Sequence, residues 1–562
     1  MSKNEKSPSS LEQKKMPTPN NAEQQSANKM KDAQTILMNL NISNNIKKIK
    51  EFLAANPNLS IIKIKNAQKY SLLHTACLNN QLEICRVFIN HEKALGSSPS
   101  DIKSWINNKT SEGFRPLHYA SFKGNIPLIK LLEEHGADIE AKNNRGLNVV
   151  HIAAQGDQPV SIAYFKKKGI SLLATDNNGS TALHWAAYFG MENATYYLTS
   201  WGCNVNQKDN EFGCTPLHLG VNSGNFKVVK RLLVKGANTK IKNKEGKDPL
   251  NLAVEGEYEG IIELLKGGNG LLSCLGVKSG VKREKKYRNF VFFLFLLVAV
   301  TAATVLLIFP FADSLIWIKV NAGLLGVAWL SFLSAWLRNP GQLKNKKGNI
   351  FELLQKHDPH LICPDCVILK PERSRHCDVC NSCISVYDHH CPWINNCVGA
   401  KNYGSFIIFI FSTLLGLGSL AITVAFHFQN SQNSPLKDNV FVNIYNIVFE
   451  KVDEHTRVLL RHGASILIIV VTVLFELPLL GLNYVHFVNL LSGKTTNERF
   501  TFNTARGETF KDQHHEHRTI SRKYSKIIQK PSKCFQWCSN CTSMCCKNAK
   551  DKKYNYSEYQ VL

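Results

Sequence analysis

The first 33 residues contain almost no large apolar side chain, and no apolar stretch typical of a secretory signal peptide occurs there. This segment is rich in Lys, Asn, Gln, Ser and Pro, so it cannot bury enough surface to offset its ordering entropy, and we expect 1–33 to be a disordered tail. Acidic residues are also few, because 43 Asp and Glu face 68 Lys and Arg, a formal net charge of +25. The excess favours an acidic partner, such as nucleic acid or an anionic membrane leaflet.

Cysteine is plentiful, with 17 residues, but the signs of a secreted disulfide framework are lacking. Seven of the 17 fall within the 35 residues from Cys363 to Cys397, together with three His, and five more lie in the last 29 residues. Such clusters without a preceding signal peptide are typical of reduced, cytosolic protein. We therefore expect metal binding or thiol chemistry in these clusters.

A repeat of about 33 residues follows the tail. Its marker is an apolar pair followed by His, and from His118 to Asn251 the steps are 33, 33, 34 and 33 residues. Each cassette contains a turn, a short helix, a glycine turn and a second apolar helix, which is the ankyrin unit. We predict an ankyrin-repeat solenoid over 34–266. The longer step of 44 residues from His74 to His118 predicts a loop inserted around Gly96–Ile106.

The repeated His is expected to be structural, satisfying backbone groups in the loops between neighbouring repeats. The stacked repeats would offer a concave face to partner proteins. The aromatic residues Tyr119, Trp185 and Tyr188 are candidate anchors on that face, and a core role for each is equally open.

Four long apolar stretches follow the repeats, so the predicted fold is all-α, a solenoid and then a polytopic transmembrane bundle. Two spans lie in 290–337, after a basic juxtamembrane linker at 267–289. Two more lie in 403–490, with a luminal loop between them. Lys and Arg crowd before the first span and after the second and fourth spans. Both termini, including the tail 491–562, and the segment 338–402 should therefore face the cytosol.

The segment 338–402, between the second and third spans, carries the chemistry. Its Cys-x-x-Cys spacings, at 363–366 and 377–380, are typical of tetrahedral zinc sites. Seven Cys and three His supply ten donors, of which two closed sites use eight, and the count alone does not say which two remain. A free Cys within 388–391 (Asp-His-His-Cys) would have an imidazole and a carboxylate nearby, the parts of an activated thiolate. A purely structural double zinc module is the alternative.

Residues 363–406 resemble the cysteine-rich domain of the DHHC protein S-acyltransferases, or palmitoyltransferases. The matching positions are Lys370, Pro371, Arg373, His376, Cys377, Asp388, His389, His390, Cys391, Trp393, Asn396, Cys397, Gly399, Asn402 and Phe406. After the fourth span, the sequence Thr-Thr-Asn-Glu at 495–498 resembles the TTxE motif of the family. With repeats in front, the chain from about 60 to 510 resembles the ankyrin-bearing branch.

This resemblance implies two structural zinc ions. One zinc would be held by Cys363, Cys366, His376 and Cys383, and the other by Cys377, Cys380, His390 and Cys397. Cys391 is then left as the catalytic nucleophile, with His389 as its base and Asp388 orienting the imidazole. Thr496 and Glu498 would brace the catalytic residues.

The implied activity is transfer of an acyl group from palmitoyl-CoA, or another long-chain acyl-CoA, through a Cys391 acyl-enzyme. The acceptors would be cysteines of proteins at the cytosolic membrane face, recruited by the ankyrin repeats, and the expected location is the Golgi or another endomembrane. The sequence departs from the family in two ways. Asn339 stands where the family commonly has Asp before Pro-Gly, and members of this branch often have six spans.

The alternative function is a non-enzymatic ankyrin-repeat membrane scaffold or channel with a structural zinc module. A channel would need a re-entrant apolar loop with filter-like glycines, which the sequence does not offer. Nucleic acid is not an expected partner, because the basic excess lies in juxtamembrane segments where an anionic leaflet explains it. The five cysteines of 534–546 are open to self-acylation, a third metal site or no role.

Overall fold

A computed structural model describes residues 35–266, 287–311, 315–343, 348–430 and 440–499. The chain forms two compact units. The first unit combines the N-terminal repeats with 342–383, and the second combines 286–341 with the residues from 384 onward. The predicted tail 1–33, the basic linker as far as residue 286 and the cysteines of 534–546 lie outside the described residues.

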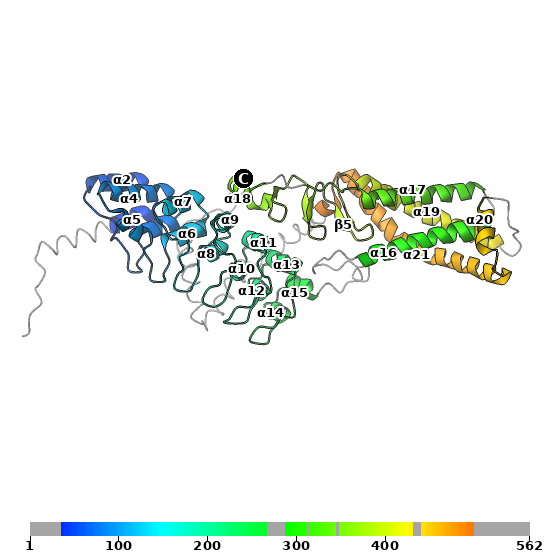
Figure 1. The fold of residues 1–562 in the computed structure, drawn as a ribbon, viewed down its shortest axis with the longest axis horizontal. Coiled ribbons are helices and arrows are strands. Elements are labelled where there is room, and N and C mark those ends of the chain that lie inside the picture. Colours follow the sequence, from blue (N-terminus) through cyan, green and yellow to red (C-terminus); the bar gives the residue numbers. More distant parts are fainter. Residues whose placement is uncertain (1–34, 267–286, 312–314, 344–347, 431–439, 500–562) are drawn as a thin grey trace, which may run out of the picture. The chain divides into compact units, whose positions relative to one another are not determined.

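Pairs of short helices stack along the first unit, which confirms the predicted ankyrin solenoid (Figure 1). A helical segment at 35–42 and α2 (Ile46–Ala55) precede the first pair. The pairs are α3 (Leu72–Leu78) and α4 (Leu82–Ala94), α6 (Pro116–Lys123) and α7 (Ile126–Glu134), α8 (Val149–Gln155) and α9 (Pro159–Lys167), α10 (Ala182–Tyr188) and α11 (Glu192–Ser200), α12 (Pro216–Asn222) and α13 (Phe226–Val234), and α14 (Pro249–Glu255) and α15 (Glu259–Lys266).

The residues inserted after α4 form a helix, α5 (Pro99–Ile106), so the predicted loop is wrong. Ser98 caps this helix by accepting a hydrogen bond from a backbone N–H of its first turn, and Pro99 follows at the first helical position. Ile102, Trp105 and Ile106 are buried. Their spacing of three and four residues forms one apolar face, a helical signal within the insertion.

The repeated His links each repeat to the next one, as predicted. His118 Nδ1 accepts a hydrogen bond from the backbone N–H of Arg115 at 3.0 Å, and Nε2 lies 3.2 Å from the carbonyl oxygen of Ala141. The same pair of contacts recurs at His74, His151, His184 and His218. Burial lowers the pKa of His118 to about 4, so the ring is neutral, with one nitrogen accepting and the other donating.

The part of the cysteine-rich segment in the first unit packs against second helices of the repeats. It contains α18 (Ile350–Lys356), the short turn η4 (Pro359–Leu361), and two antiparallel hairpins, β1 (Ile362–Cys363) with β2 (Ile368–Leu369) and β3 (Arg375–Cys377) with β4 (Ser382–Ile384). The ring of Phe351 lies 5.6 Å from that of Tyr164 on α9. Tyr197 of α11 donates a hydrogen bond to the carbonyl oxygen of Pro359 at 2.9 Å.

The second unit contains four helices long and apolar enough to cross a membrane, as predicted. The first, α16 (Tyr287–Ala303), continues through a π-helical turn, η2 (Thr304–Ile308), and a 3-10 turn, η3 (Phe309–Phe311). The others are α17 (Leu315–Leu337), α19 (Tyr403–Asn430) and α21 (Glu454–Ser492), and a short helix, α20 (Val440–Phe449), precedes the last. Helix α19 packs against both α17 and α21.

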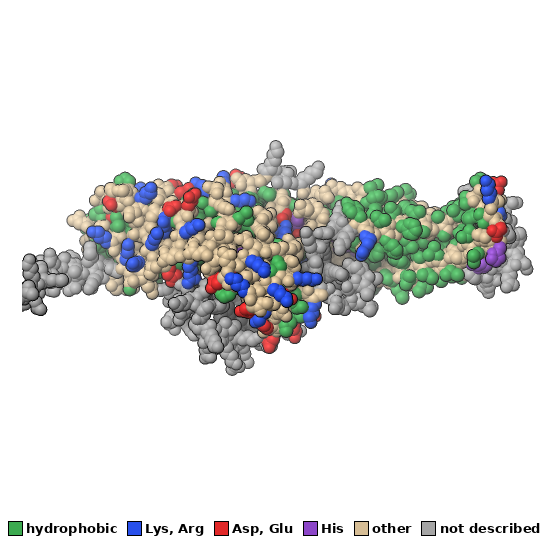
Figure 2. All heavy atoms as spheres, turned by 60° about the horizontal axis from the view of Figure 1, so that its bottom comes forward, with side chains coloured by type: hydrophobic (Ala, Val, Ile, Leu, Met, Phe, Trp, Pro, Cys, Tyr) green, Lys and Arg blue, Asp and Glu red, His purple; other side chains and the backbone are tan. Residues whose placement is uncertain are grey.

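Apolar side chains cover the outer surface of these four helices (Figure 2). Phe295, Ile316 and Leu330 are among the exposed large side chains. A continuous apolar surface of this size is typical of contact with lipid.

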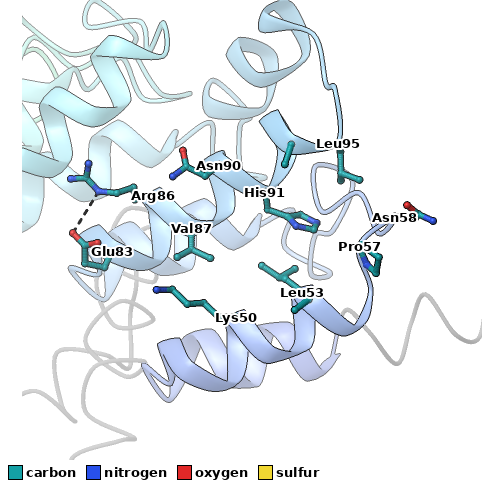
Figure 3. Close-up of a pocket in the computed structure, with 12 residues that line it drawn as sticks. Lys50, Leu53, Pro57, Asn58, Glu83, Arg86, Val87, Asn90, His91 and Leu95 are labelled. Atoms are coloured by element: carbon teal, nitrogen blue, oxygen red, sulfur yellow. Dashed lines mark ion pairs between the residues drawn. The ribbon is translucent and has the colours of Figure 1, made fainter.

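A groove opens near the start of the repeats, between α2 and α4 (Figure 3). Lys50 and Leu53 line it from α2, and Arg86 and His91 line it from α4. Its lining residues include none of the predicted catalytic or metal-binding residues.

Candidate active site and metal centres

The predicted catalytic residues lie on a β-hairpin of the second unit. Strand β5 (His389–Cys391) pairs antiparallel with β6 (Asn396–Val398), and His390 stands opposite Cys397 in the register. Because side chains alternate along a strand, His389 and Cys391 share one face and His390 takes the other. The hairpin therefore separates the predicted catalytic pair from the predicted metal ligand.

Two asparagines fasten this hairpin to the C-terminal end of α17. Asn396 Nδ2 lies within 3.0–3.2 Å of the carbonyl oxygens of Ala335, Trp336 and Arg338, and Asn402 Nδ2 donates to that of Ala335 at 3.1 Å. The last carbonyls of a helix have no partner within the helix, so these amides satisfy them. The catalytic hairpin is thus held against the second membrane span.

The turn after α17 keeps its geometry despite the departure at Asn339. Asn339 Oδ1 accepts a hydrogen bond from the backbone N–H of Gly341 at 2.8 Å, a bond that an aspartate could make equally well. Gly399 packs close to this turn, where a Cβ would lie 2.6 Å from the carbonyl oxygen of Pro340. The contact leaves no room for a side chain at 399.

Asp388 holds His389 and is itself held from the C-terminal side of α21. Its Oδ2 lies 2.7 Å from His389 Nδ1, and its Oδ1 accepts the backbone N–H of Thr496 at 2.8 Å. The carboxylate is fully buried, and the imidazole is 30% exposed. With Nδ1 turned to Asp388, the other ring nitrogen is left for Cys391, to which His389 also hydrogen-bonds.

The TTxE-like segment, 495–498, forms a tight turn that directs the backbone N–H of Thr496 toward Asp388. Glu498 accepts a hydrogen bond from the N–H of Thr495 at 2.6 Å, and Asn489 Nδ2 donates to the hydroxyl of Thr496 at 2.8 Å. Thr496 thus contacts the carboxylate of Asp388 directly, and Glu498 supports the turn that contains Thr496. Asn489 also holds Thr496 in place, and the sequence motif did not indicate this residue.

The electrostatics of the site favour a charged pair. Burial alone would lower the pKa of His389, but hydrogen bonds with Asp388 and Cys391 outweigh it and raise that pKa to about 9. Burial alone would raise the pKa of Asp388, but the hydrogen bonds from His389 and Thr496 hold it below its usual value. At neutral pH the carboxylate is therefore ionised and the imidazole protonated, so the two form a charged pair beside Cys391.

Cys391 borders the apolar interior of the membrane helices. It is 5% exposed, and its cluster includes Phe290 from α16, Phe332 from α17 and Phe409 from α19. Leucines of α21 pack against the same cluster. The sulfur therefore lies where a polar hydrogen-bond network meets an apolar helical bundle.

His486 of α21 also belongs to the site, although the sequence did not single it out. Its ligating atom and those of Asp388 and His389 all lie within 4.8 Å of one another, and its Nδ1 shares a hydrogen bond of 3.1 Å with the hydroxyl of Tyr403. The ring is 2% exposed. A histidine within an otherwise apolar span is the one sequence signal that could have indicated it.

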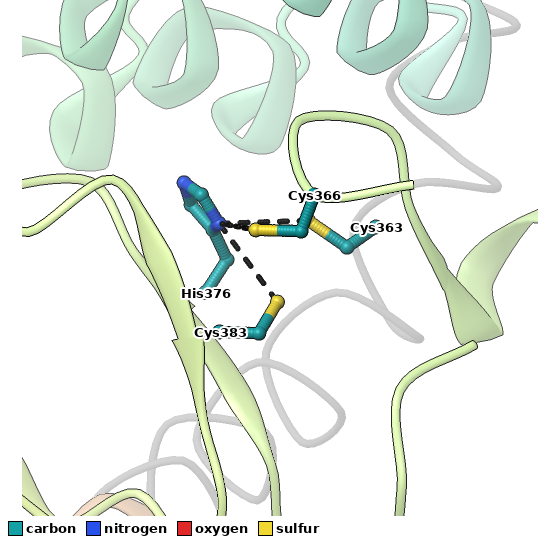
Figure 4. Close-up of side chains that lie close together, drawn as sticks. All are labelled: Cys363, Cys366, His376 and Cys383. Carbon is teal, nitrogen blue, oxygen red and sulfur yellow. Dashed lines mark hydrogen bonds between the residues drawn. The ribbon is translucent and has the colours of Figure 1, made fainter. Parts of the chain in front are cut away.

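The first predicted set of zinc ligands is assembled within the first unit (Figure 4). One ligating atom from each side chain lies within 4.8 Å of the others, and His376 Nδ1 is 3.5, 3.4 and 3.9 Å from the three sulfurs. Three thiolates and one imidazole are a closed tetrahedral zinc set. The four residues are Cys363, Cys366, His376 and Cys383.

The second predicted set is present as two pairs of donors. In the first unit, the backbone N–H of Cys380 donates to Cys377 Sγ at 3.4 Å, as expected for a Cys-x-x-Cys turn. In the second unit, His390 Nδ1 lies 3.7 Å from Cys397 Sγ. In each pair the two ligating atoms lie within 4.8 Å of each other, close enough to bind one metal ion.

Comparison with known families gives the same division of the chain. Residues 356–503 match the family model described as DHHC palmitoyltransferase, and 37–143, 117–209 and 202–271 match ankyrin repeats. The chain joins ankyrin repeats to a DHHC palmitoyltransferase domain. The family resemblance predicted from the motifs is confirmed.

Similar proteins are named palmitoyltransferases. Palmitoyltransferase ZDHHC13 of Pongo abelii is 28% identical over 423 residues, covering 62% of this chain and 65% of that protein. Palmitoyltransferase ZDHHC17 of Homo sapiens is 28% identical over 418 residues, covering 63% of this chain and 65% of that protein. This chain thus matches just under two thirds of the length of these relatives.

Proposed function

We propose that this DHHC chain is a protein S-acyltransferase that moves a long-chain acyl group from acyl-CoA to cysteines of proteins at the cytosolic membrane face. The proposal rests mainly on a series of hydrogen bonds that runs from Thr496 through Asp388 and His389 to Cys391. These residues lie at the edge of an apolar helical bundle. This arrangement places an imidazole beside the nucleophile, next to apolar side chains that an acyl chain would contact.

In the first half-reaction, the thiolate of Cys391 attacks the thioester carbonyl carbon of acyl-CoA. The bond between that carbon and the sulfur of CoA breaks, and the leaving thiolate takes the proton that His389 carries. Asp388 keeps the imidazole in the tautomer and orientation that this transfer needs. The product is an acyl-enzyme on Cys391.

In the second half-reaction, neutral His389 accepts the proton of a client cysteine. The client sulfur attacks the acyl carbon, the bond to Cys391 breaks, and the thiolate and imidazolium pair is restored. A thioester replaces a thioester in both steps, so alignment and a supply of thiolate are the main catalytic needs. The aromatic cluster around Phe332 and Phe409 would hold the acyl chain near the bundle.

Zinc has a structural role in this proposal. The set Cys363, Cys366, His376 and Cys383 would hold one zinc, and the pairs Cys377 with Cys380 and His390 with Cys397 would together hold the second. When bound, zinc would fix the hairpins of this segment, since protein ligands fill all four positions of each site. Cys391 remains outside both sets.

The ankyrin repeats would recruit the client proteins. Of the three predicted anchors, Tyr119 is buried and donates a hydrogen bond to Tyr70, which indicates a core role. Trp185 and Tyr188 are half-buried on α10 and form an aromatic group with Phe189. These side chains are the better candidates for peptide contact.

The basic residues flanking the spans favour both termini in the cytosol, with the DHHC segment on the same side. We place the protein in the Golgi or another endomembrane as part of this proposal. The cysteines of client proteins would then be reduced and accessible.

The direct test is autoacylation of the purified protein with palmitoyl-CoA. The label should appear on Cys391 through a hydroxylamine-labile bond and should be absent in Cys391→Ser. Cys203→Ser, at a buried repeat cysteine, is the matched control and should acylate normally. Acylation of Cys391→Ser at the wild-type rate would overturn the enzyme proposal in favour of a membrane scaffold.

A further inference from the structure

The first metal cluster lies against the ankyrin repeats, and both belong to the first unit. In Figure 4, one ring nitrogen of His376 faces the three sulfurs and the other points away from them. The second nitrogen, Nε2, is buried and makes no hydrogen bond among the described residues. A metal-bound histidine commonly offers this N–H to a carboxylate, which fixes the ring and strengthens it as a ligand.

Two carboxylates lie beside this nitrogen. Asp365 Oδ2 is 3.8 Å and Asp378 Oδ1 is 4.0 Å from His376 Nε2. Asp365 sits between two cysteines of the cluster in the sequence, and its side chain is 9% exposed. Both separations are ion-pair contacts longer than a hydrogen bond, so the carboxylates act on the ring through their charge.

Helix α13 and its C-cap supply the cations that hold these carboxylates. The guanidinium of Arg231 lies 3.2 Å from Asp365 and 3.5 Å from Asp378, and Lys235 Nζ lies 2.8 Å from Asp365. The side chains of Arg231 and Asp365 are 12% and 9% exposed, so the ion pair between them is largely buried. Such pairs resist separation, because removing one partner leaves an uncompensated buried charge.

Neighbouring α11 fixes Arg231 in turn. The guanidinium stacks over the ring of Tyr196, with 4.0 Å to its centroid, and donates hydrogen bonds to the hydroxyls of Thr199 and Ser200 at 3.1 and 2.7 Å. The hydroxyl of Tyr196 lies 3.9 Å from Cys363 Sγ. Tyr196 therefore contacts both the cation and a sulfur of the cluster.

We propose that the ankyrin array is part of this metal site, with Arg231 and Lys235 as positioning residues that hold Asp365 behind His376 and slow metal loss. The inference rests on the zinc assignment of the proposed function. Three thiolates and one Zn²⁺ carry a net charge of −1, and the two carboxylates add −2. Lys370 of the cysteine-rich segment interacts with Cys363 and Cys383, and the two cations of α13 and its C-cap add positive charge on the side of the carboxylates.

The test is zinc release from the full-length protein in detergent, challenged with excess chelator and followed with a colorimetric zinc indicator. Wild-type protein should hold two zinc ions. Arg231→Ala and Asp365→Asn should each release one of them about 10-fold faster. The double variant should release zinc more slowly than the product of the two single effects predicts, because the arginine acts in part through Asp365.

Lys227→Ala is the matched control, since Lys227 lies on the same helix and pairs with Glu192 at an exposed site. Its zinc release should equal that of the wild type. Asp365 lies outside the repeats, so faster zinc release in Asp365→Asn cannot be caused by misfolding of the ankyrin array. Substitution by Co²⁺ gives a second readout, because the absorption bands assigned to three sulfurs and one nitrogen should shift in Arg231→Ala.

Wild-type release rates in both variants would overturn the inference and leave the zinc assignment intact. A wild-type protein without zinc on this cluster would overturn the zinc assignment and the inference together. Acylation of Cys391 is measured separately and would stand in either case.

Discussion

Replacing Asp388 by Asn changes one atom in the proposed catalytic chain. In the wild type, Oδ1 accepts the N–H of Thr496, and Oδ2 accepts the proton on His389 Nδ1. Asn keeps an oxygen for Thr496 and places an NH₂ group against His389. Nδ1 must then become an acceptor, so Nε2 carries the proton and cannot take one from Cys391.

The expected decrease in the rate of acyl-enzyme formation can be calculated from these contacts. The bond between Asp388 and His389 is a buried, charge-assisted hydrogen bond of 2.7 Å, and such bonds contribute about 1.5–3 kcal/mol, or roughly 10- to 100-fold in rate. Loss of general-base help costs about 10²–10⁴-fold. We therefore expect acyl-enzyme formation to slow by about 10²-fold or more in Asp388→Asn.

The assay is the single-turnover rate of acyl-enzyme formation with palmitoyl-CoA, together with zinc content. Asp388→Ala removes both hydrogen bonds and should be at least as slow, whereas Asp358→Asn, at an exposed carboxylate, should match the wild type. Both zinc ions should be retained in all three variants. A rate for Asp388→Asn within about threefold of wild type would refute the tautomer argument.

Three further outcomes are expected. Elemental analysis should find two zinc ions per chain, with one lost in Cys380→Ser and none lost in Cys391→Ser, because only the former is a proposed ligand. Thr496→Pro, at the first position of a helical turn where proline fits, removes the N–H that Asp388 accepts and should slow acyl-enzyme formation about 10-fold or more. Thr496→Val keeps that N–H and should slow it less. The fragment 35–266 should unfold cooperatively by circular dichroism, with a midpoint unaffected by chelator, because its repeats bury their own apolar faces.

The sequence predicted the features that depend on local spacing. The 33-residue period, the apolar length of the spans and the Cys-x-x-Cys turns each recur within short windows, so the solenoid, the four spans and the ligand set around His376 are recovered from one sequence. The motif at 388–391 is equally local, and the catalytic role assigned to its residues stays a prediction. The backbone N–H of Thr496 that meets Asp388 also lies within a recognisable motif.

The features that escaped prediction depend on contacts between distant segments. Arg231 and Asp365 are 134 residues apart in sequence, and neither spacing nor composition distinguishes this arginine from other repeat cations. His486 reaches His389 only because α21 packs against α19. The helix α5 was missed for a different reason, because the insertion was judged by its length rather than by its three buried apolar residues.

Docking of the cysteine-rich segment on second helices of the repeats affects how client recruitment should be tested. Deleting the array removes the proposed client surface and also removes Arg231 and Lys235 from Asp365, so a loss of acyl transfer after deletion has two causes. A substitution at Tyr188, on a first helix, leaves these ion pairs in place. Loss of client acylation with normal autoacylation would then report recruitment alone, since the two functions of the array use different helices.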